Sequence, residues 1–184
     1  MSNEDIIKSI KKDFRLGMNG IVSTSMREKG MNYKINFGLS LPQIRNIAQK
    51  YPQNSEVAEM LWKENIRESK LLATMLYPLK EMTLDKAEKW INDIEYNEVS
   101  DIASMYLFAK VPFAIELVLN NIKTDNDNKI YFGLRLLTRL LINKTEISNL
   151  SLSEIANITR NCTSSNNITV ALVANDVIQR LGIE

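Results

Sequence analysis

Two carboxylates, Glu98 and Asp101, stand three residues apart in the segment YNEVSD, residues 96–101. On a helix, residues three apart lie on one face, so the two side chains are neighbours separated by one turn. Carboxylates placed in this way can transfer a proton or stabilise a positive charge that develops during a reaction. The alternative is structural, because acidic residues in the first turn of a helix favour its dipole and are usually solvated.

The composition excludes several other kinds of site. The chain has no histidine, which excludes Ser-His-Asp and Cys-His catalysis and removes the commonest metal ligand, so we expect no metal and no cofactor. The single cysteine, Cys162, excludes an internal disulfide, fits a reducing compartment and is interpreted as an inert thiol near a helix end. The net charge is only +1, so a basic surface that binds nucleic acid has to be a local patch.

Helical periodicity extends over almost the whole chain. The six glycines and four prolines are too few for the many turns of an all-β fold. The helix predicted over residues 98–109 carries Asp101, and longer helices are predicted over residues 125–142 and 168–181. A shorter helix, with Ile21, Val22, Ser25 and Met26 on its apolar face, is expected to end near Gly30.

Capping residues support several of these boundaries. Residues 40–43 (SLPQ) and 151–154 (SLSE) have the capping-box pattern, which predicts a helix start at each place. Gly182 is expected to end the last helix. Trp62 and Trp90 lie on apolar faces and are predicted to be core residues.

About eleven short helices in pairs of ~40 residues indicate an all-α fold, a curved α-α superhelix of the HEAT/ARM-like helical repeat type. A helical pair cannot bury its apolar face alone, so neighbouring pairs stack. A globin-like helical globule is the alternative. No linker divides the sequence, so residues 1–184 are expected to form a single domain. Without a leader or an uncharged span, the chain is expected to be cytoplasmic and to have no membrane partner.

Three segments of the first half of the chain resemble one known family. They read FGLSLP at residues 37–42, AEMLW at residues 58–62 and ESKLLA at residues 68–73. Over roughly residues 30–80, this order is similar to that of the DNA alkylation repair family, the AlkD-like DNA glycosylases. The resemblance implies a stack of HEAT-like repeats and a bacterial DNA repair function that needs no metal.

The same resemblance implies an active segment at residues 96–101. The family pattern there is Asn-Trp-Asp-x-x-Asp, in which Asp101 matches the last aspartate. Glu98 stands where the family has its first aspartate, and Asn97 stands where it has tryptophan. We therefore expect Asp101 to be the catalytic carboxylate, Glu98 to assist it, and Asn97 to lie at the substrate.

A second part of the family site is expected on the segment IYFGLR, residues 130–135. Tyr131 suits the aromatic position of the family pattern, but Gly133 and Leu134 stand where arginines are expected. Arg135 is the nearest cation, and a shift of one residue turns a helical side chain by ~100°. The departures remove a stacking partner for a cationic base and a bidentate phosphate contact.

The family releases cationic alkylated purines, such as 3-methyladenine and 7-methylguanine, from duplex DNA. A positively charged base is already a good leaving group, so the resemblance implies that the carboxylate stabilises an oxocarbenium-like sugar and positions water. Loss of the tryptophan and the arginine weakens this chemistry, since each 1.36 kcal/mol of barrier is about tenfold in rate.

Further candidates for contacts with DNA are scattered along the chain, and the alternative for each is a solvated surface residue. They are Lys34, Asn36, Arg45, Lys70, Arg135, Arg139 and Arg160. Three functions remain open: a glycosylase, a catalytically inactive relative that binds DNA, and a helical-repeat scaffold that binds protein.

Overall fold

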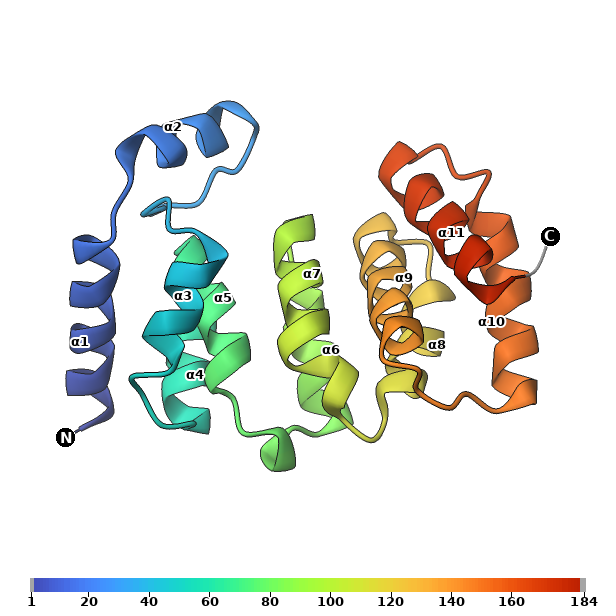
Figure 1. Cartoon of the computed structure of the whole chain (residues 1–184), viewed down its shortest axis with the longest axis horizontal. Helices are drawn as coiled ribbons and strands as arrows, with labels where there is room; N and C mark the ends of the chain where they lie inside the picture. Colours follow the sequence, from blue (N-terminus) through green and yellow to red (C-terminus); the bar gives the residue numbers. More distant parts are fainter. Residues whose placement is uncertain (1, 183–184) are drawn as a thin grey trace. The chain divides into compact units, whose positions relative to one another are not determined.

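The computed structural model describes residues 2–182, whose regular structure is helical (Figure 1). The α-helices are α1 (Asn3–Leu16), α2 (Gly20–Glu28), α3 (Leu41–Ala48), α4 (Ser55–Trp62), α5 (Arg67–Leu76), α6 (Leu84–Asn92), α7 (Asn97–Tyr106), α8 (Ala114–Ile122), α9 (Asp127–Ile142), α10 (Asn149–Cys162) and α11 (Ile168–Leu181). Two 3-10 helices, η1 (Leu79–Glu81) and η2 (Phe108–Lys110), lie between them. An isolated parallel bridge joins Ile35 to Ile66.

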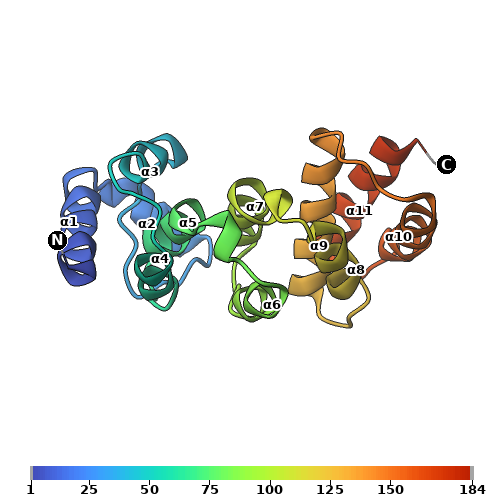
Figure 2. The ribbon, with the colours of Figure 1, turned by 90° about the horizontal axis from the view of Figure 1, so that it is seen from below.

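The chain is divided between Glu81 and Met82 into two compact units. In the first unit, α5 packs against α3 and α4, and α1 packs against α4. In the second unit, α9 contacts α6, α7, α8 and α11, and Figure 2 shows it lying between α7, α8 and α11. The helix that neighbours the most others in this unit is therefore α9, while the single domain expected over residues 1–184 stays a prediction.

Each unit has its own apolar core. Both tryptophans are buried as predicted, Trp62 in the first unit and Trp90 in the second, each 2% exposed. In the second unit, the rings of Phe108 and Phe132 meet edge to face with centroids 5.4 Å apart, which joins η2 to α9. Buried leucines on both sides of this contact complete the core, as the helical periodicity indicates.

Gly133 allows α8 and α9 to approach each other closely. A Cβ at this position would lie 2.7 Å from Cγ2 of Ile122 and 3.3 Å from the carbonyl oxygen of Val118. Such distances are shorter than ordinary van der Waals contacts, so a larger residue would push the two helices apart. Packing therefore explains why a glycine stands in the segment where the family pattern has arginine.

The predicted helix boundaries agree with the structure in some places and differ in others. At the start of α3, the side-chain oxygen of Gln43 accepts hydrogen bonds from the backbone N–H and the hydroxyl of Ser40, as the capping-box pattern predicts. Gly182 ends α11 in the left-handed region, also as predicted. The predicted start at Ser151 is wrong, because Ser148 caps α10 by accepting a hydrogen bond from the backbone N–H of Ser151.

Two further expectations about helices need correction. The helix predicted over residues 98–109 ends at Tyr106, and a 3-10 turn follows it. The apolar face predicted for α2 is not buried at Ile21, whose side chain is 85% exposed.

No helix within residues 2–182 combines the length and the apolar character that a membrane crossing requires.

Candidate functional site

Asp101 lies at the centre of a small polar cluster on facing sides of α7 and α9. Its Oδ1 atom accepts a hydrogen bond from Nε of Arg135 at 2.6 Å and a second from the hydroxyl of Tyr131 at 3.1 Å. Tyr131 and Arg135 are four residues apart on α9, so both side chains leave the same face of that helix. The packing of α7 against α9 brings this face to Asp101.

The two oxygens of the Asp101 carboxylate have different surroundings. Both donors of the cluster bind Oδ1, and no side chain or backbone group of the described residues binds Oδ2. The Asp101 side chain is 30% exposed and that of Arg135 is 26% exposed. The cluster therefore holds a carboxylate by one oxygen and leaves the other open to a ligand or water.

Tyr131 acts as a hydrogen-bond donor at neutral pH. Burial raises the pKa of its hydroxyl to about 12, and the nearby negative charge of Asp101 adds to this shift. Arg135 acts in the opposite direction because its positive charge favours the phenolate. The phenol is 7% exposed and carries its proton throughout the neutral range.

The other two residues of the predicted active segment lie in the first turn of α7. Asn97 is exposed at the helix start, and Glu98 is partly exposed beside it. The structural alternative of a carboxylate that favours the helix dipole fits Glu98 in this position. It does not fit Asp101, which lies in the second turn, where the effect of the dipole has largely fallen away.

The sequence predicts that Arg135 contacts a phosphate, and the structure shows that it also binds Asp101. Nε of its guanidinium is used by Asp101, whereas its two Nη groups bind no side chain or backbone group of residues 2–182. The neighbouring positions, Gly133 and Leu134, are buried in the core. Neither donor to Asp101 was predicted from the sequence, although the four-residue spacing of Tyr131 and Arg135 is a recognisable signal once the facing helix is known.

Arg139 follows Arg135 by one further turn on α9. Its side chain is partly exposed, and it has no hydrogen bond or ion pair within the described part of the chain. By contrast, Nη1 of Arg160 on α10 donates a hydrogen bond to Oδ1 of Asn157 at 3.3 Å. Like the Nη groups of Arg135, the side chain of Arg139 is therefore available for a phosphate contact on α9.

The remaining basic candidates lie in the first unit. The side chains of Lys34 and Arg45 are exposed and have no partner among the described residues. Lys70 is engaged, because its Nζ atom donates to the carbonyl oxygen of Trp62 at 2.9 Å and lies 4.8 Å from the centroid of the Trp62 ring. Because Asp101 belongs to the other unit, the convergence of these cations around it stays a prediction.

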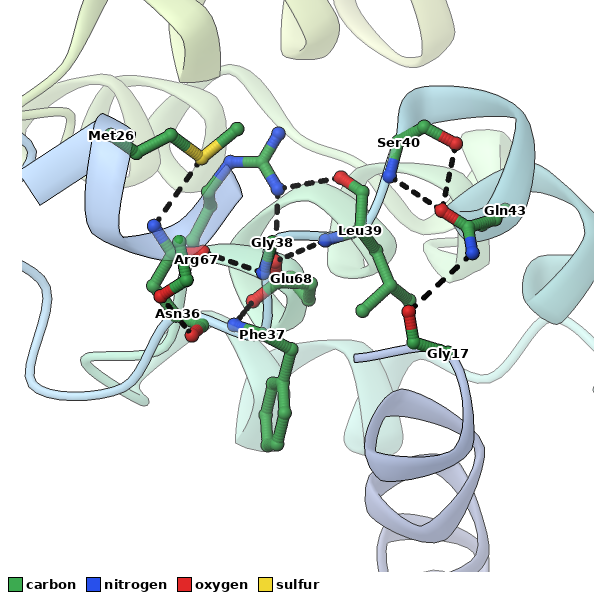
Figure 3. Close-up of polar contacts among 11 residues, drawn as sticks. Gly17, Met26, Asn36, Phe37, Gly38, Leu39, Ser40, Gln43, Arg67 and Glu68 are labelled. Atoms are coloured by element: carbon green, nitrogen blue, oxygen red, sulfur yellow. Dashed lines mark hydrogen bonds and ion pairs between the residues drawn. The ribbon is translucent and has the colours of Figure 1, made fainter. Parts of the chain in front are cut away.

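Asn36 is buried in the loop before α3, shown in Figure 3. Its Oδ1 atom accepts a hydrogen bond from the backbone N–H of Gly38 at 2.9 Å, and its Nδ2 atom points to the sulfur of Met26 at 3.4 Å. Ser23 on α2 donates to the carbonyl oxygen of Asn36 at 2.7 Å. The structure thus places this predicted DNA contact in a set of bonds that ties α2 to the loop.

A buried ion pair supports the same loop. The Glu68 carboxylate accepts hydrogen bonds from the backbone N–H groups of Phe37 and Leu39, at 3.0 and 3.2 Å, and from Nη1 of Arg67 at 2.9 Å. Arg67 also donates to the carbonyl oxygen of Leu39 at 2.9 Å (Figure 3). The segment with which the family resemblance begins is therefore tied into the fold through Glu68 and Arg67.

Comparison with known folds places the whole chain among helical-repeat proteins. A solved structure, described as belonging to a new family of proteins related to the HEAT-like repeat DNA glycosylases with affinity for branched DNA structures, is similar with a TM-score of 0.84. The two sequences are 16% identical, and the match covers 95% of this chain and 74% of the other. The fold is thus all-α and HEAT-like, as predicted, and the globin-like alternative is wrong.

Comparison of sequences agrees with this assignment. None of the curated proteins searched matches the chain. The family model described as DNA alkylation repair enzyme matches residues 10–129, which is more than half of the sequence and wider than the segments that first resembled it. The chain belongs to the DNA alkylation repair enzyme family.

Proposed function

We propose that this protein hydrolyses the N-glycosidic bond of cationic alkylated purines, such as 3-methyladenine and 7-methylguanine, in duplex DNA, with Asp101 as the catalytic carboxylate. The observation that carries the proposal is the asymmetric binding of that carboxylate. Two donors hold Oδ1, while Oδ2 has no partner among the described residues and the side chain is partly exposed.

This arrangement suits a reaction in which the leaving group already carries a positive charge. The bond between C1′ and the base nitrogen breaks, and its electron pair passes to the cationic ring, which leaves as a neutral base. The sugar then carries the positive charge, which Oδ2 of Asp101 stabilises. Water adds to C1′ and loses a proton to the solvent, which leaves an abasic site. In this proposal Glu98, three residues before Asp101 on α7, assists.

Contacts with the DNA backbone are the second requirement of the proposal. The free Nη groups of Arg135 can bind a phosphate while Nε stays on Asp101, because a guanidinium has five donors in a planar fork. Arg139 offers a second guanidinium one turn further along α9. The carboxylate and these cations lie in the same unit, which supports a site where backbone and sugar are held together.

A second candidate function is binding of DNA without base release. The exposed Asn97 favours it, because this side chain cannot stack on a cationic base as an aromatic ring does. The related protein of known structure, described as having affinity for branched DNA, supports the same candidate. A bacterial origin and a cytoplasmic location stay predictions of the sequence.

The test is release of 7-methylguanine and 3-methyladenine from methylated duplex DNA, compared with a sample without protein because these bases also leave spontaneously. Asp101→Asn keeps an acceptor for Tyr131 and Arg135 but removes the negative charge, so we expect release to fall by roughly a hundredfold or more. Asp125→Asn, at an exposed position before α9, is the matched control and is expected to behave like the wild type.

Equal release by the wild type and Asp101→Asn would contradict the role of Asp101. Absence of release above the spontaneous level, together with salt-dependent binding of duplex or branched DNA, would favour the second candidate. Absence of both would favour a scaffold that binds protein.

A further inference from the structure

We propose that Tyr131 is a positioning residue whose hydroxyl fixes the Asp101 carboxylate so that Oδ2 is the oxygen presented to the sugar. This inference rests on the proposed function and goes beyond it, because it assigns a role to a residue that does not itself touch the substrate. It also predicts that the direction of the carboxylate, and not its charge alone, determines how strongly the site binds a cationic sugar.

An aspartate needs such a partner because its own side chain does not define the plane of the carboxylate. The terminal torsion of aspartate is broad and roughly two-fold, so the two oxygens exchange places easily unless external contacts prevent it. One donor on Oδ1 restricts this rotation, and a second donor from a different direction restricts it further. Arg135 and Tyr131 provide these two donors from successive turns of α9.

Tyr131 is itself held firmly. Its ring is 7% exposed, and α9 packs against four other helices of the unit. The next residue, Phe132, is fully buried against Phe108, and Gly133 sits against α8. A hydroxyl on a rigid ring is a better defined donor than the long guanidinium side chain of Arg135, which has more rotatable bonds and is 26% exposed.

The decisive comparison uses two duplexes that differ only in charge at one sugar. In one duplex a pyrrolidine ring replaces a deoxyribose; this ring is positively charged and imitates the oxocarbenium-like sugar. The other duplex contains a neutral tetrahydrofuran ring at the same position. A site complementary to the transition state binds the cationic duplex more tightly. The ratio of the two dissociation constants measures how strongly the oriented carboxylate favours a positive charge at the sugar. The measurement requires no turnover, and the contribution of general DNA affinity cancels in the ratio.

Tyr131→Phe keeps the buried ring and removes only the hydroxyl. We expect the preference for the cationic duplex to fall by roughly tenfold in this variant, with affinity for the neutral duplex unchanged. Tyr106→Phe is the matched control, because Tyr106 lies at the end of α7 and its hydroxyl has no hydrogen bond within the described residues. The control is expected to keep the full preference.

A second measurement tests the hydrogen bond itself. The absorbance change of tyrosine ionisation, taken as wild type minus Tyr131→Phe, should show Tyr131 titrating with a pKa of about 12. The same difference measured in an Asp101→Asn background should give a lower pKa, because the charge of Asp101 helps to raise it. An unchanged pKa would overturn the inference, whatever the DNA result.

The two proposals fail in different ways. If Asp101→Asn abolishes the preference for the cationic duplex but Tyr131→Phe keeps it, the positioning role is overturned and the catalytic carboxylate stands. If Asp101→Asn leaves the preference unchanged, the proposed function is overturned, and with it any role of Tyr131 in presenting that carboxylate.

Discussion

Among the glycines of the first unit, Gly38 is the one at which an added Cβ meets the closest neighbours. Its φ is +72°, and a Cβ there would lie 2.3 Å from the carbonyl oxygen of Asn19 and 2.8 Å from the backbone nitrogen of Ser23. Only a glycine allows the loop before α3 to approach the start of α2 so closely. At the scale of a single residue, this contact decides whether α2 can lie where it does.

We therefore expect Gly38→Ala to lower the free energy of unfolding by about 3 kcal/mol, from left-handed strain together with the clash. Gly20→Ala is the matched control, because outside the adjacent residues and the backbone of its own helix no described atom lies within 4 Å of a Cβ placed there. Urea unfolding followed by circular dichroism measures both variants. Equal stabilities would show that the loop relaxes around the added methyl group.

At the scale of the element, α9 is the helix on which the proposed DNA contact depends. Arg139 has no partner in the described structure and lies one turn beyond Arg135. Arg139→Ala is expected to weaken DNA binding several-fold for all sequences and to reduce the salt slope by about 1, as loss of one phosphate contact should.

Arg180→Ala is the control for this change of charge, because Arg180 on α11 is occupied by Asp176, at 2.8 Å. Fluorescence anisotropy over a series of salt concentrations measures both the affinity and the slope. If the two variants lose affinity equally, the effect belongs to net charge and not to α9.

Local sequence predicts the elements better than it predicts their contacts. Periodicity located α11 at residues 168–181, and it placed the end of α9 at Ile142, because both helices bury regular apolar stripes. It failed at Ile21, because α2 is short and is held through Ser23 and Asn36, not through an apolar face. Periodicity cannot detect polar contacts of this kind between segments that lie apart in the sequence.

The candidate site shows the same limit. Asp101 was found because its segment resembles a family pattern. Its two donors were not found, since they follow at distances of 30 and 34 residues and meet it only through the packing of α7 on α9. Helix packing depends on the whole core of the unit, including Gly133 against α8, and therefore cannot be read from the segment that contains the acid.

At the scale of the whole molecule, both units should lose stability at alkaline pH. Burial raises the pKa of Tyr51 in the first unit and of Tyr131 in the second to about 12, and each hydroxyl donates to an aspartate, Asp13 and Asp101 respectively. The unfolded value is about 10. Between these values the unfolded chain has lost protons that the native protein keeps, so the free energy of unfolding falls as pH rises.

The stabilisation is fully present below about pH 10 and is lost as pH approaches about 12. We expect Tyr51→Phe and Tyr131→Phe each to make the decline shallower, because phenylalanine has no proton to lose. Urea unfolding at pH values of about 9, 10 and 11 measures the slopes. Slopes parallel to that of the wild type in both variants would assign the decline to other groups.

The family match ends at residue 129, two positions before the tyrosine that holds Asp101. In this chain the match therefore covers the acid but not its two donors on α9, so chains collected by such matches can differ at these donors. A second filter, which requires Tyr-x-x-x-Arg with the tyrosine 30 residues after the aspartate, would divide such a collection by the geometry of the site. Substrate screening would then compare subgroups that are defined by the residues of the site and not by family membership alone.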